Sequence, residues 1–70
     1  MRNIPFDRKL ELVKKIMERE LTPLQRQTVE AYYLRGMTLE QIAQERYVNK
    51  STVQRTLKRG EQRIRRFLLL

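Results

Sequence analysis

Apolar residues recur along this chain at helical spacing, and the signals of a β-hairpin are absent. A stripe at positions i, i+3 and i+7 predicts a first helix over about residues 7–20, with Asp7 placed to cap its start. The stripe consists of Leu10, Val13 and Met17, with Ile16 beside them. Three further stretches continue the pattern, which therefore predicts a small all-α domain of four helices.

A second helix is predicted over about residues 23–35. Thr22 is a favoured N-cap residue, Pro23 suits the first helical position because its missing N–H would have no partner there, and Gln25 can complete a capping box. Gly36 can adopt the left-handed conformation that ends a helix. The expected apolar side of this helix is Leu24, Thr28, Ala31, Tyr32 and Leu34.

The capping pattern recurs at TLEQ, residues 38–41, and predicts a short third helix over about residues 39–46. Asn49, another favoured N-cap residue, precedes a fourth helix over about residues 50–67. Its expected inward residues are Val53, Leu57, Ile64 and Phe67 or Leu68. Two helices joined by about three residues, the second strongly basic, are typical of a helix-turn-helix, to which the first helix adds a packed N-terminal element.

The core positions of this motif determine which side chains remain outside. Leu39, Ile42 and Ala43 share one face of the short helix, and Ala43 is small enough for a crossing helix. Val53, ten positions on, can fill the angle between the two helices. The opposite side of the fourth helix is then left to polar residues: Lys50, Ser51, Gln54, Arg55 and Lys58.

The net charge of +8 is concentrated in the C-terminal third of the 70 residues. Residues 1–45 carry eight Lys or Arg against seven acids, an excess of one, whereas residues 46–66 carry eight against Glu61 alone, an excess of seven. Such a field suits a polyanionic partner because it steers association and releases counterions from phosphates. A basic helix that is merely solvated is the open alternative.

Composition excludes several classes of function. The chain has no Cys and no His, which removes disulfides, thiolate metal sites and the commonest metal ligand and general base. With its acids scattered singly, it is not expected to be an enzyme or to bind a metal or a cofactor. We find no linker, repeat, signal peptide or membrane-spanning stretch, and both Gly and both Pro are placed where helices would begin or end. We therefore expect one domain over residues 1–70, soluble and cytoplasmic.

The exposed side chains of the fourth helix match the chemistry of duplex DNA. Arg and Lys donate to guanine, and Gln pairs bidentately with adenine. Because residues early in a recognition helix reach the bases, the predicted base readers are Lys50, Ser51, Gln54 and Arg55. The predicted phosphate contacts are Arg35, Thr38, Thr52, Lys58, Arg59 and Arg63.

Residues 21–66 resemble region 4 of bacterial sigma factors. The resemblance is carried by the opening LTPLQRQ, by the helix-ending Gly36, and by the segments TLEQIA and STVQRTLKRG. It implies a helix-turn-helix that binds the upstream promoter hexamer, with RNA polymerase as a second partner. The chain is also similar to LuxR-type response-regulator domains, which share the LT start, a pattern like GMTLEQIA, and a TV at the recognition helix.

Two departures from the sigma pattern are visible. Region 2 cannot fit in the residues before Leu21, so the chain is either an isolated region-4-like module, bacterial or phage in style, or a fragment of a longer protein. Where the family usually has a leucine and a glycine, this chain has Arg46 and Tyr47. Because a left-handed tyrosine costs about 1 kcal/mol or more, we expect a longer turn in which Tyr47 fills the core.

Two apolar features leave alternatives open. The terminal residues Phe67 to Leu70 either pack on the first helix or form a homodimer seam, which would favour a palindromic site. Tyr32, Tyr33 and Tyr47 are expected to pack in the core with their hydroxyls at its rim. Two functions remain: a sequence-specific regulator that binds double-stranded DNA, or a sigma-like module that docks on RNA polymerase or another factor and binds DNA weakly.

Overall fold

In the computed structural model, the backbone is described for residues 6–68 and the side chains for residues 11–68. The described residues form a small all-α domain without strands, as the pattern predicted. Each predicted helix begins and ends within one residue of its expected position. The elements are α1 (Phe6–Glu20), α2 (Pro23–Val29) continued directly by η1 (Glu30–Leu34), α3 (Leu39–Arg46) and α4 (Lys50–Leu68).

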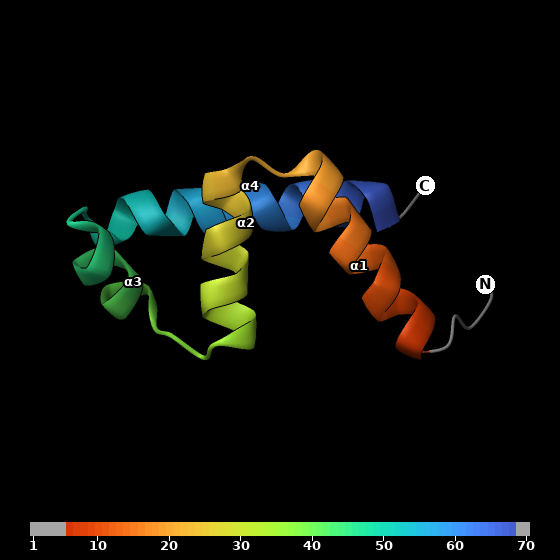
Figure 1. Cartoon of the computed structure of the whole chain (residues 1–70). Coiled ribbons are helices and arrows are strands. Elements are labelled where there is room, and N and C mark those ends of the chain that lie inside the picture. Colours follow the sequence, from red (N-terminus) through yellow and green to blue (C-terminus); the bar gives the residue numbers. More distant parts are fainter. Residues whose placement is uncertain (1–5, 69–70) are drawn as a thin grey trace.

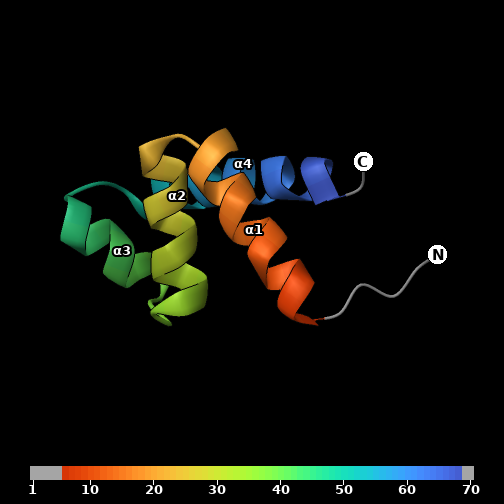
Figure 2. The same cartoon turned by 45° about the vertical axis from the view of Figure 1, so that its right-hand side comes forward.

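The long helix α4 runs along the molecule, and the other helices pack on it (Figure 1). α3 lies at the N-terminal end of α4, α2 crosses its middle, and α1 lies against its C-terminal half. The view in Figure 2 shows the same order from another side. The described part is elongated, with extents of 41 × 19 × 19 Å, so the two ends of α4 have different neighbours.

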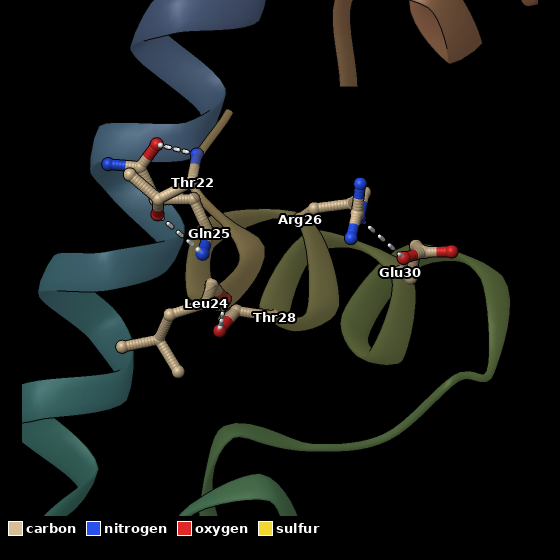
Figure 3. A network of polar contacts seen from close by, with 6 residues as sticks. All are labelled: Thr22, Leu24, Gln25, Arg26, Thr28 and Glu30. Carbon is tan, nitrogen blue, oxygen red and sulfur yellow. Dashed lines mark hydrogen bonds and ion pairs between the residues drawn. The ribbon is translucent and has the colours of Figure 1, made fainter. Parts of the chain in front are cut away.

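Both predicted capping boxes are present. The Thr22 N–H donates to Gln25 Oε1 (3.2 Å), and the Gln25 N–H donates to Thr22 Oγ1 (3.1 Å; Figure 3). Thr38 and Gln41 repeat this exchange at 2.9 and 3.1 Å at the start of α3. Gly36 has φ 68°, the left-handed conformation expected where the second helix ends.

The core consists of two clusters along α4. The α3 cluster is formed by Ala31, Ile42, Ala43 and Val53. The α1 cluster is formed by Met17, Leu21, Val29 and Leu57, with Val13 and Ile64 packed against it. Leu39 contacts both clusters, so it joins them into one interior. The side chain of Leu10, predicted to belong to this core, lies outside the described side chains.

The predicted apolar side of the second helix was partly wrong. Thr28 and Ala31 are buried as expected, but Leu24, Tyr32 and Leu34 are exposed, and Val29 is buried instead. For Tyr32 and Leu34 the reason is η1, a π-helical turn in which the Arg35 N–H donates to the Glu30 carbonyl five residues earlier (3.0 Å). The wider turn rotates the residues after Glu30 out of the α-helical stripe.

The expectation that both glycines mark helix ends was also wrong, because Gly60 lies inside α4 and is buried. A Cβ atom at this position would lie 2.9 Å from Val29 Cγ2 and 3.7 Å from Gln25 Cβ. Glycine is therefore required here by the close approach of α2, which a side chain would push away.

A buried hydroxyl connects the second helix to α3. Thr28 is fully buried, donates to the Leu24 carbonyl (2.7 Å) and accepts a hydrogen bond from Arg46 Nη1. Because a buried polar group is costly without partners, this pairing favours one placement of α3 against α2. No sequence pattern had suggested this role for Arg46.

The turn between α3 and α4 differs from the predicted one. Tyr47 adopts the left-handed conformation (φ 57°) and its side chain is 95% exposed, so it does not fill the core. The turn keeps the short form, with Val48 donating to the Ala43 carbonyl (3.0 Å). Asn49 directly precedes α4, and its carbonyl accepts from Thr52 at 3.0 Å. The left-handed residue closes α3 where glycine would be unstrained.

Candidate nucleic-acid interface

α3 and α4 form a helix-turn-helix whose inner side is closed by apolar packing. Ile42 and Val53 are each only 1% exposed, and Ala43 is buried between the same elements. Val53 and Leu57, four residues apart, both face inward, so the rotation of α4 about its axis is determined. The polar residues between them must face away from the core.

The predicted base readers Lys50, Ser51, Gln54 and Arg55 are all exposed, and they share the first two turns of α4. At about 100° per residue, Lys50 and Gln54 form one ridge, and Ser51, Arg55 and Lys58 form the next. We call these four predicted base readers the reading face. It presents cationic, hydroxyl and amide donors side by side, as recognition of base edges requires.

One member of the reading face has a partner within the protein. Lys50 Nζ lies 3.4 Å from Glu40 Oε1, with both side chains more than half exposed. An exposed pair of this kind contributes about 1 kcal/mol or less. Lys50 can therefore exchange Glu40 for a DNA acceptor at little cost.

The predicted phosphate contacts are exposed as well, and they lie on three segments. Thr38 caps the start of α3 and, together with Lys50, lines a hollow of about 540 Å³ between the end of η1 and the start of α4. Arg35 precedes Gly36 in the loop before α3. The remaining candidates, Thr52, Lys58, Arg59 and Arg63, are carried by α4 itself.

Farther along α4, packing assembles a second basic surface, which we call the arginine cleft. It has a volume of about 470 Å³ and is lined by Gln25, Arg59, Gln62, Arg63 and Arg66. Sequence reasoning had singled out only Arg59 and Arg63. Gln62 and Arg66 could have been found from their helical spacing to Arg59, but Gln25 arrives from α2 and only the tertiary structure shows it.

A different surface lies between α1, the second helix and the C-terminal half of α4. This apolar groove has a volume of about 340 Å³. Its lining residues are Val13, Met17, Val29, Tyr33, Leu34, Glu61, Ile64, Arg65 and Leu68. None of the four residues of the reading face lines this groove.

The prediction that the tyrosines pack in the core was wrong, because Tyr32, Tyr33 and Tyr47 are all exposed. Tyr32 and Tyr33 contact each other edge to face, with ring centroids 4.9 Å apart. The Tyr33 hydroxyl donates to the Glu61 carboxylate, and this hydrogen bond, with some burial, raises the pKa of Tyr33 to about 12. The pair joins η1 to α4 at the rim of the apolar groove.

At the C-terminal end, Phe67 is half-buried and borders a hollow with Leu12 and Ile16 of α1. Phe67 therefore lies on the side of α4 that faces the first helix, whereas Leu69 and Leu70 lie outside the described residues. Within the described part of the chain, no cluster of acidic, His or Cys side chains could hold a metal ion. No helix there is long and apolar enough to cross a bilayer.

Comparison with known protein families matches residues 17–64 to Sigma-70, region 4. The matched segment begins near the end of α1 and includes α2, η1, α3 and most of α4, so it contains the helix-turn-helix and the reading face. No curated protein and no solved structure matches the chain.

Proposed function

The chain belongs to the sigma-70 region 4 family of DNA-binding helix-turn-helix domains, and we propose that it is a sequence-specific transcription regulator. In this proposal the N-terminal half of α4 enters the major groove of duplex DNA. The family is not enzymatic. Its membership supports a bacterial or phage protein that acts in the cytoplasm.

The observation that carries the proposal is the rotation of α4 set by its buried residues. Val53 and Leu57 are held against α3 and the second helix, which leaves the reading face outward on the first two turns. Arg55 has the fork geometry that recognises guanine, and Gln54 has the paired donor and acceptor that recognise adenine. Lys50 and Ser51 supply further donors at the helix start.

The positions of the predicted phosphate-contacting residues support the same orientation. Thr38 and Arg35 lie on the α3 side, and Thr52, Lys58, Arg59 and Arg63 extend along α4. Such contacts position the protein on the duplex and carry no sequence information. They predict an affinity that falls steeply with salt concentration.

The direct test is selection of bound duplexes from a randomised pool at near-physiological salt, followed by sequencing. One short enriched site is expected for a monomer, and a palindrome would indicate a homodimer. Arg55→Ala should relax the preference at one position by about 1–3 kcal/mol, whereas Arg59→Ala should weaken binding to all sequences alike. A folded protein that enriches no sequence, or two variants that bind as the wild type does, would contradict the proposal.

A second candidate function is docking on RNA polymerase, a partner that the family implies. The observation that favours it is the apolar groove, whose borders include the exposed side chains of Tyr33 and Leu34. Leu34→Asp should then reduce binding of purified polymerase without affecting the selected DNA site. The opposite pattern, loss of DNA binding with polymerase unaffected, would exclude this groove as the docking surface.

A further inference from the structure

We propose that the arginine cleft binds a phosphate of the DNA backbone beside the site read by the N-terminal half of α4. This inference rests on the proposed function and deepens it. It adds Gln25, Gln62 and Arg66 to the DNA-binding residues, and it assigns the cleft to one ligand chemistry: a phosphodiester of the same duplex.

The side chains that line the cleft are suited to binding an anion. Three guanidinium groups and two carboxamides border it, and no carboxylate does. Among the side chains described, residues 11–68, none of these three arginines forms a salt bridge. Guanidinium groups bind phosphate oxygens through paired N–H donors, so this set offers several bidentate arrangements.

Gln25 is oriented toward α4 by the capping box. Its Oε1 accepts from the Thr22 N–H, which leaves the Nε2 group as a donor. In Figure 3 the carboxamide of Gln25 points toward α4, whereas Arg26 and Glu30 point away from it. The same interaction that starts α2 therefore aims a donor at the arginines.

Gly60 allows the close contact between α2 and α4. Because Gly60 has no side chain, α2 lies so close that an added Cβ would be 2.9 Å from Val29 Cγ2 and 3.7 Å from Gln25 Cβ. Arg59 and Arg63 of α4 then border the same space as Gln25. The cleft is thus a consequence of the closest contact between α2 and α4.

The length of α4 places the cleft at the DNA backbone. Its 19 residues span about 28 Å at 1.5 Å per residue, whereas the major groove is about 12 Å wide. The first two turns fill the groove, so the following turns must leave it. Arg59, Arg63 and Arg66 lie 4 to 11 positions beyond Arg55, about 6–17 Å along the axis, where a phosphate strand flanks the groove.

The test compares the affinities of variants for two duplexes. The long duplex extends beyond the selected site far enough to reach the cleft, and the truncated duplex ends at the edge of the selected site. Gln25→Glu keeps the capping box, because Glu serves there as Gln does, but places a carboxylate in the cleft. Arg66→Gln removes one donor fork. The matched control is Lys14→Gln on α1, which lowers the net charge by one, as each cleft variant does, at an exposed residue outside the cleft.

On the long duplex, each cleft variant should bind about tenfold more weakly, with a salt slope smaller by about 1 for Arg66→Gln. The truncated duplex should show little difference between them and the control. Thermal unfolding should be unchanged for Gln25→Glu, and Arg66→Gln provides a test that does not involve the cap.

Three results would overturn the inference. Wild-type protein that binds the selected site while both cleft variants bind equally well would exclude the cleft and leave the proposed function standing. Equal losses on both duplexes would show that the cleft acts only through net charge. Wild-type protein that binds no duplex would refute the proposed function and the cleft together.

Discussion

The two ends of α4 are built differently. At the N-terminal end, the α3 cluster closes completely around Ile42 and Val53, each 1% exposed. Toward the C-terminal end, the α1 cluster has members such as Met17, at 7% exposure, beside an apolar groove of about 340 Å³. One helix therefore has a tightly enclosed end and a more open end.

The difference between the two ends matches the two functions proposed for them. In the proposed function, base reading requires the side chains of α4 to be held within narrow limits, which close packing around Val53 provides. The open end carries exposed apolar and aromatic side chains that are suited to contact with another molecule. The following predictions test this contrast, beginning with the largest expected effect.

Removing core volume should cost more at the enclosed end. Ile42→Ala should lower the free energy of unfolding by about 2–5 kcal/mol, because a fully enclosed site cannot collapse around the cavity. The loss in free energy of unfolding for Met17→Ala should lie at or below the lower end of that range, because water can enter the cavity from the groove. Urea unfolding of the two variants measures this, and a larger loss for Met17→Ala would reverse the comparison.

The crossing of α2 and α4 separates the two ends, and Gly60→Ala should disturb it. The added methyl meets Val29 at 2.9 Å, so overpacking costs about 1–3 kcal/mol, against a gain of about 1 kcal/mol in helix propensity. A net loss of up to about 2 kcal/mol is expected in chemical denaturation.

A double-mutant cycle gives this prediction its control. In a Val29→Ala background, Gly60→Ala should cost less, because the clashing methyl is gone. Gly36→Ala should also destabilise the protein, through its positive φ in open space, but Val29→Ala should not relieve that loss. Equal coupling for both glycines would argue against a steric role for Gly60.

Tyr47 is the strained residue of the enclosed end. Tyr47→Gly should raise the free energy of unfolding by about 1 kcal/mol, because glycine adopts the left-handed conformation freely and an exposed ring loses no packing. Tyr47→Ala, which keeps the strain, should give no such gain. Thermal unfolding of the three proteins distinguishes these cases, and a loss on Tyr47→Gly would show that the ring stabilises the fold.

The smallest effect is expected at the open end, from the hydrogen bond between Tyr33 and Glu61. The pKa of Tyr33 is raised from 10.0 to about 12, so its stabilising contribution is present below pH 10 and is lost as the pH rises toward 12. Since Tyr33 is more than half exposed, the contribution should stay below about 1 kcal/mol.

The measurement is the melting temperature of wild type and Tyr33→Phe from about pH 8, below the ordinary tyrosine pKa of about 10, up to about pH 12. The wild type should lose its small advantage across this range, while the ionisation of other tyrosines affects both proteins alike. A difference that stays constant with pH would show that the hydroxyl contributes nothing through Glu61.

Local signals predicted much of this fold. Thr22 and Thr38, each followed three residues later by a glutamine, marked the starts of α2 and α3, because capping depends on neighbouring backbone groups alone. The period of Val53 and Leu57 predicted the buried side of α4 in the same way. The exposure of the reading face follows directly from that side.

The errors arose where distant residues decide the local structure. Tyr47 takes a strained conformation because the packing of Ala43 and Val53 holds the turn short. Leu34 is exposed because η1 changes the helical period, and Val29 is buried where Gly60 lets α4 approach. Neither effect is visible in the periodicity of a single segment.

The amino-acid sequence by itself determined the four helices, their caps, the position of the helix-turn-helix and the excess of positive charge on α4, because each depends on neighbours along one segment. Only the tertiary structure decided which side chains of different helices lie close together. Gln25 joins Arg59 and Arg63 because Gly60 brings α2 onto α4, and Arg46 reaches Thr28 because α3 folds back on the second helix. Such meetings depend on packing between residues far apart in the chain, which no local pattern encodes.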